Sequence, residues 1–88
     1  MSKYISIKSL AKFHQLHEQI LLDIIEFEIV PIKKRQQNIL VNTEDLEVFE
    51  RAIRLYHELE VNLQGVDIIC RMHKQIIEMQ EELNRLKN

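Results

Sequence analysis

The stretch 17–41, HEQILLDIIEFEIVPIKKRQQNILV, decides the fold because it changes from helical to strand character within a few residues. Apolar residues at three-four spacing predict a helix over about 17 to 27. Two β-branched runs, Ile29–Ile32 and Ile39–Val41, then flank the polar insert KKRQQN. Pro31 cannot donate a backbone hydrogen bond, which restricts the first run to an edge strand. The stretch therefore predicts a helix followed by a small β-hairpin, or wing.

The segment before this stretch predicts a shorter helix over about 7 to 13. Ser6 is a suitable N-cap, because its hydroxyl can accept a free backbone N–H of the first turn. The connection HQLH is too brief for anything but a turn, so the two helices form a helix-turn-helix. The apolar side of the first helix is expected to comprise Ile7, Leu10, Ala11 and Phe13. The core face of the second is expected to comprise Ile20, Ile24 and Phe27, flanked by Leu21 and Ile25.

Two more helices are expected after the wing. Asn42 can cap a third helix over about 43 to 59, and Asn62 can cap a last one over about 63 to 86. Three-four spacing in the third helix predicts a buried stripe of Leu46, Phe49, Ile53, Tyr56 and Leu59. The chain is thus expected to be all-α with a small β wing, with a winged helix-turn-helix domain over 1–62 and a C-terminal helix over 63–88.

Composition limits the function classes. A chain of 88 residues with a formal net charge of −2 lacks the basic excess of most nucleic-acid-binding domains, whose affinity comes largely from neutralised phosphates. With a single Gly and no phosphate loop, nucleophile elbow or acid pair, neither an enzyme nor a cofactor is expected. Cys70 is the only cysteine, which fits a reducing compartment. With no signal-peptide-like or membrane-spanning apolar run, a soluble cytoplasmic protein is expected.

The second helix carries carboxylates where a DNA-reading helix would need donors. Residues 17–28 contain four acidic residues and no Lys or Arg. A helical wheel places five residues on the arc opposite its core face, and we call this set the acidic face: Glu18, Gln19, Leu22, Asp23 and Glu26. Such a surface repels a phosphate backbone but suits a basic protein partner, with Leu22 as an apolar anchor. A solvated acidic face with one stray leucine is the simpler alternative.

The last helix has the most regular periodicity in the chain. Its apolar residues alternate steps of three and four and form a heptad seam: Ile69, Met72, Ile76, Met79, Leu83 and Leu86. The far side of the helix is polar, so we expect a homodimer formed through residues 66 to 86. The alternative is a helix folded back onto its own domain. Sequence leaves parallel and antiparallel pairing open.

Two further signals are weaker. Lys33, Lys34 and Arg35 form a basic cluster at the wing tip, where a solvated hairpin tip is the favoured interpretation and contact with nucleic acid or with a protein partner are the alternatives. The pairs His14 with His17 and Cys70 with His73 have ligand-like spacing, but a structural zinc site needs four ligands and no metal is expected.

The order of these elements carries a family resemblance. ISIKSLAKF and ILVNTEDLEVFERAIRLYHEL resemble the first and post-wing helices of MerR-type winged helix-turn-helix domains. The ending ELEVNLQGVDIICRMHKQIIEMQEELNRL, above all its junction LEVNLQG, resembles the chaperone modulator CbpM family, and the resemblance covers nearly the whole chain. It implies an adaptor that binds the J-domain of a DnaJ-like co-chaperone and blocks its work with a DnaK-type chaperone. The partner-facing helix of a J-domain is basic, so the acidic face would be the contact row.

The chain also departs from the DNA-binding branch of this family. MerR-like regulators typically carry basic and tyrosine positions along the second helix, where this chain has Gln19, Leu22 and Asp23, and Gln15 replaces the Gly common in the inter-helix turn. A MerR-like DNA-binding transcriptional regulator remains the second hypothesis. A dimeric interaction module with another basic partner is the third.

Overall fold

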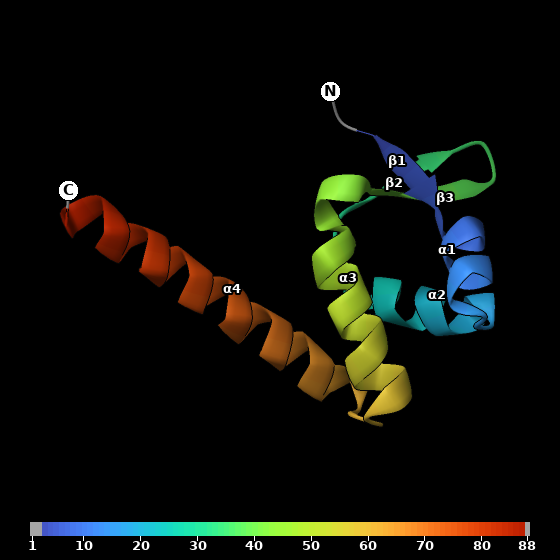
Figure 1. The fold of residues 1–88 in the computed structure, drawn as a ribbon. Coiled ribbons are helices and arrows are strands. Elements are labelled where there is room, and N and C mark those ends of the chain that lie inside the picture. The colour runs from blue at the N-terminus through green and yellow to red at the C-terminus, as the bar shows by residue number, and fades with distance from the viewer. Residues whose placement is uncertain (1–2, 88) are drawn as a thin grey trace.

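The computed structural model describes residues 3–87 and places a small sheet and three short helical segments in one body, from which a long helix projects (Figure 1). The expected fold class, a mostly helical winged helix-turn-helix with a long C-terminal helix, is confirmed. In chain order the elements are β1 (Tyr4–Ser6), α1 (Ile7–His14), α2 (Glu18–Glu26), β2 (Ile32–Arg35), β3 (Asn38–Asn42), the 3₁₀ turn η1 (Thr43–Asp45), α3 (Leu46–Ile53), the π-helical turn η2 (Arg54–Glu58) and α4 (Leu63–Lys87).

All three expected N-caps form. Ser6 Oγ accepts a hydrogen bond from the backbone N–H of Ser9 at 3.1 Å, and Asn42 Oδ1 accepts one from Glu44 at 2.9 Å. Asn62 Oδ1 accepts from the N–H of Gly65 at 2.8 Å. Each cap satisfies a backbone donor that has no partner within its helix, and together they fix where α1, η1 and α4 begin.

The sheet has a strand that sequence analysis missed. Its order is β1-β3-β2, with Ile5 opposite Val41 and Val41 opposite Ile32. Three residues are too few to show a period of their own, so β1 exists only because β3 pairs with it. The expected edge position of the first wing strand is confirmed, since β2 lies at one side of the sheet.

The wing boundaries differ from the prediction. We expected a strand at 29–32 and a loop from Lys33 onward, but β2 runs from Ile32 to Arg35 and the hairpin turns over Gln36 and Gln37. Pro31 lies just before the strand, and Gln36 adopts φ 57°, the left-handed region that two-residue hairpin turns require. Lys33, Lys34 and Arg35 therefore belong to the strand, because they pair with residues of β3.

The core lies between the sheet, α1, α2 and α3. Its largest fully buried side chains are Phe49, Leu21, Ile24, Val41 and Val66. The expected core face of α2 is confirmed for Ile24 but shifted toward its expected flank, because α2 packs against both α1 and α3 and its buried side is centred on Leu21 and Ile24. Ile20 and Phe27 are only half-buried.

Two residues expected inside are outside. Phe13 is 75% exposed, because it lies roughly 120° on the helical wheel from the buried line of α1. Leu59 is 64% exposed, because the expected helix over 43–59 is not continuous. It opens with η1 and widens into the π-helical turn η2, which rotates Leu59 away from the stripe.

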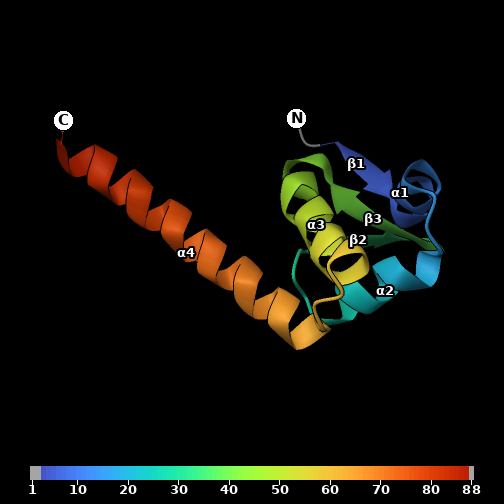
Figure 2. The same cartoon turned by 60° about the horizontal axis from the view of Figure 1, so that its bottom comes forward.

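The last helix leaves the domain after its second turn. Only Val66 and Cys70 of α4 are buried, and the C-terminal part of the helix beyond His73 projects away from the domain in both views (Figures 1 and 2). The folded-back alternative for this helix is therefore wrong. No helix within residues 3–87 combines the length and apolar character needed to cross a membrane.

Candidate functional site

The turn before α2 sets the position of this helix. Gln15 adopts φ 57° and ψ 44°, and its N–H closes α1 by donating to the carbonyl of Lys12 at 3.2 Å. This left-handed conformation favours glycine. Glycine is also the residue that is common in the inter-helix turn of the MerR-type domains that the sequence resembles. A non-glycine residue thus occupies the turn, and α2 starts at Glu18, three residues after the turn residue.

The acidic face of α2 lies on the outside of the domain. Gln19 and Glu26 are exposed, and Glu18, Leu22 and Asp23 are half-buried. Leu22 packs in part against the core, which holds its side chain in place at the surface. The face is therefore open to a partner and is not sealed inside the domain.

Asp23 is the member of the acidic face that is fixed by hydrogen bonds. Gln19 Nε2 donates to Asp23 Oδ1 at 2.8 Å, and the hydroxyl of Tyr56 donates to Oδ2 at 3.5 Å. Among residues 3–87, neither Glu18 nor Glu26 takes part in an ion pair. Two carboxylates of the face thus keep their charge available to an incoming cation.

The basic cluster of the wing lies on a strand rather than at a loop tip, contrary to the prediction. Lys33, Lys34 and Arg35 all belong to β2 and are exposed. Lys33 pairs with Leu40, so its side chain shares the outer face of the sheet with Tyr4, and Lys33 Nζ lies 5.0 Å from the centre of the Tyr4 ring. This cation–π contact stabilises Lys33 at the surface of the sheet.

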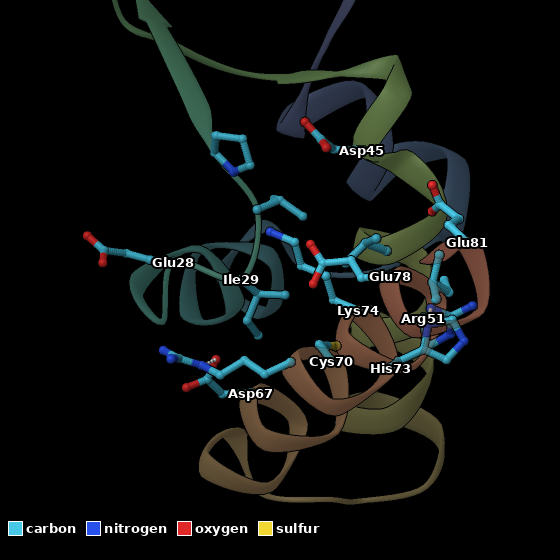
Figure 3. Close-up of a pocket in the computed structure, with 15 residues that line it drawn as sticks. Glu28, Ile29, Asp45, Arg51, Asp67, Cys70, His73, Lys74, Glu78 and Glu81 are labelled. Atoms are coloured by element: carbon cyan, nitrogen blue, oxygen red, sulfur yellow. Dashed lines mark hydrogen bonds and ion pairs between the residues drawn. The ribbon is translucent and has the colours of Figure 1, made fainter. Parts of the chain in front are cut away.

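A cavity of about 570 Å³ lies in the angle between α4 and the domain (Figure 3). Arg51 Nη1 lies 3.0 Å from His73 Nδ1 at one end of the cavity. Arg71 Nε donates to Asp67 at 3.0 Å at the other, which raises the pKa of the Arg71 guanidinium. The members of each pair are thus engaged with one another, Arg51 with His73 and Arg71 with Asp67.

Cys70 forms part of the floor of this cavity. Its thiol is buried, and desolvation raises its pKa, an effect that Asp67 reinforces and Arg51 opposes. A protonated, covered thiol is a poor nucleophile and a poor metal ligand. Cys70 therefore acts as a packing residue where α4 meets the domain.

The residues with metal-ligand spacing do not converge. His14 Nε2 lies 3.0 Å from Glu50 Oε2 and ties α1 to α3, and His17 is exposed. His73 is engaged by Arg51. Within the described part of the chain, no group of three or more His, Cys, Asp or Glu side chains gathers in a way that could hold a metal ion.

The heptad seam of α4 is exposed along its length. Its members are exposed by the following fractions: Ile69 38%, Met72 54%, Ile76 47%, Met79 59%, Leu83 57% and Leu86 74%. A row of apolar side chains on a helix that projects from its domain favours burial against another surface.

Sequence reasoning missed the part of the surface that η2 contributes. Residues of this turn and of the link to α4 line a groove beside α2, formed by Ile20, Tyr56, His57, Glu60, Val61 and Asn62. The only signal in the sequence was the break in periodicity at EVNLQG, which marks the end of a helix but not the widened turn before it.

The comparisons agree with this architecture. Residues 5–88 match the family model described as MerR HTH family regulatory protein. A comparison with curated proteins gives no significant match.

Proposed function

The chain belongs to the MerR HTH family of regulatory proteins, and on this premise we propose that it is a chaperone modulator that binds the J-domain of a DnaJ-like co-chaperone. The contact is made by the acidic face of α2, and the binding inhibits the co-chaperone. The resemblance of the C-terminal segment to the CbpM family supplies the class of partner.

One observation carries this proposal. The second helix of the helix-turn-helix, the position from which a regulator reads DNA, turns a face with carboxylates outward, and the stretch from His17 to Glu28 contains no Lys or Arg. Phosphate repels such a surface, whereas a basic helix is attracted and oriented by it.

The mechanism is occlusion without chemistry. Glu18 and Glu26 attract the basic helix of the J-domain, and Leu22 supplies an apolar contact that is desolvated when the partner arrives. Because Leu22 already rests on the core, little side-chain freedom is lost on binding. The J-domain surface covered in this way is the one that would engage the DnaK-type chaperone.

The same proposal includes a homodimer. The exposed heptad seam of α4 pairs with the seam of a second copy, which removes its apolar side chains from water. Each dimer then carries two acidic faces.

Calorimetric titration of the purified J-domain from the same organism into the full chain tests the site. We expect a Leu22→Ala, Asp23→Lys double variant to bind at least about tenfold more weakly than wild type, because an anchor is lost and a charge is reversed. Glu81→Lys, an exposed charge reversal on α4, serves as the control and leaves the affinity within about threefold. Unchanged affinity of the double variant would exclude the acidic face as the site.

A second candidate function is a MerR-like DNA-binding transcriptional regulator. The observation that favours it is the exposed basic strand β2, with Lys33 and Arg35 on the outer face of the wing. Three cations on one strand are few beside the 6 to 10 phosphate contacts that give strongly salt-dependent binding, so we rank this function second.

A further inference from the structure

A groove runs beside the acidic face, between α2 and the π-helical turn. This shallow groove, which is open to solvent, has a volume of about 470 Å³, enough for one large apolar side chain, and we call it the π-turn groove. Ile20 and Tyr56 form its walls on α2 and η2, and Val61 lies at its end, each half-buried. The groove therefore offers apolar surface directly next to the carboxylates of α2.

The widened turn shapes this groove. The N–H of Val61 donates to the carbonyl of Leu55 at 2.9 Å, which closes the chain back on itself after η2. Glu60 adopts φ 56° in this reversal, so its side chain is exposed on the rim while Val61 turns inward. A regular helix continuing through 59 would not present these two residues to α2.

Both rims of the π-turn groove are anionic. Glu60 lines the groove, and Asp23 lies beside its α2 side, where an oxygen of its carboxylate is 3.5 Å from the hydroxyl of the lining residue Tyr56. Two basic residues belong to η2: Arg54 lies in a separate groove with Glu50 and Glu58, whereas His57 lines the π-turn groove near Glu60. A ligand that fits here combines an apolar side chain with positive charges on either side of it.

We propose that the π-turn groove receives an apolar side chain of a basic helix, with Lys or Arg residues of the same helix pairing with Asp23 and Glu60. Lysines or arginines three or four residues away from the apolar one would reach the two rims, because those spacings share a helical face. This inference rests on the proposed function and enlarges its site from the acidic face to the π-turn groove. Carboxylates alone attract any cation, whereas the groove selects the partner that also carries the apolar residue.

Charge reversal at Glu60 tests the groove. We expect Glu60→Lys to weaken binding of the organism's own J-domain to the full chain by about tenfold, since a rim carboxylate is replaced by a repelling cation. Glu58→Lys is the matched control, because it makes the same charge change two residues away on a side chain that lines the other groove. The control is expected to stay within about threefold of wild type.

A second variant tests the apolar part. Tyr56→Ala removes a wall of the groove and should also weaken J-domain binding, while circular dichroism verifies that the variant is folded. If the Leu22→Ala, Asp23→Lys variant loses binding but Glu60→Lys and a folded Tyr56→Ala bind like wild type, the groove inference is overturned and the proposed function stands. If wild type itself does not bind the J-domain, both are overturned.

Discussion

The hydroxyl of Tyr56 lies 3.5 Å from a carboxylate oxygen of Asp23, which joins the π-helical turn to the outer side of α2. Gln19 approaches the other oxygen of the same carboxylate at 2.8 Å. Asp23 is thus oriented by one partner from its own helix and one from a distant segment. These contacts fix the position of the acidic face relative to the π-turn groove.

Removing this hydroxyl should cost little stability. The contact is long, so Tyr56→Phe is expected to lower the free energy of unfolding by less than about 1 kcal/mol, measured by urea denaturation. Tyr4→Phe is the control, because its ring faces Lys33 and its hydroxyl forms no hydrogen bond within residues 3–87. A loss above about 2 kcal/mol at Tyr56 would show that the hydroxyl is a main support of the fold.

The two phenylalanines at 49 and 13 should behave in opposite ways. Phe49→Ala removes a fully buried ring and is expected to cost about 3 to 5 kcal/mol, enough to unfold a small domain. Phe13→Ala alters a side chain that is 75% exposed, and a change within about 0.5 kcal/mol is expected. Phe49→Leu, which keeps part of the volume, gives an intermediate value if Phe49→Ala is too unstable to measure. Equal effects of the two alanine variants in thermal unfolding would contradict the assigned core.

The heptad seam predicts the oligomeric state, which can be read from the molecular mass in solution. Ile76→Asp places a charge on the seam and should convert the proposed homodimer to a monomer in light scattering, because an unpaired carboxylate is costly to bury. Asn84→Asp adds the same charge to α4 outside the seam and should leave the dimer intact. A monomeric wild type, or a dimer that tolerates Ile76→Asp, would rule out pairing through these residues.

The buried thiol of Cys70 makes stability depend on alkaline pH. Burial raises its pKa above the ordinary value of 9.0, so the folded chain holds the proton more tightly than the unfolded chain. This contribution is fully present below pH 9 and is lost as the pH rises through the raised pKa of the folded state. The free energy of unfolding should therefore fall above about pH 9, and Cys70→Ala should lack this part of the fall. Identical pH profiles for the two proteins would mean that the thiol is not desolvated.

DNA binding provides the last test. We expect no gel shift that survives moderate salt, because the chain has a net charge of −2 and its second helix is acidic. A shift that persists at moderate salt and disappears when Lys33, Lys34 and Arg35 are changed to Ala would reverse the ranking of the two functions.

The parts of the fold that depend on neighbouring residues could be predicted from the sequence. Ser6, Asn42 and Asn62 cap their helices as expected, because a cap needs only the three residues that follow it. β1 could not be found in this way, since Ile5 becomes a strand residue only by pairing with Val41. Leu59 was misplaced because the wheel assumes 3.6 residues per turn and η2 is wider.

The candidate site was predicted in part for the same reason. Wheel geometry on α2 found Glu18, Gln19, Leu22, Asp23 and Glu26, and the structure leaves these residues at the surface. It could not show that Tyr56 reaches Asp23 or that Glu60 stands across a groove from it, because both depend on a turn that departs from helical periodicity.

The basic residues of β2 also bear on how the protein stays dispersed. A three-stranded sheet has two open edges, and an unpaired edge can recruit strands from other molecules and start aggregation. β1 offers only three residues at one edge, while Lys33, Lys34 and Arg35 line the other. If two such edges approached each other, their like charges would repel. The basic cluster therefore opposes edge-to-edge pairing and fibre-like assembly, and this role does not depend on any contact with nucleic acid.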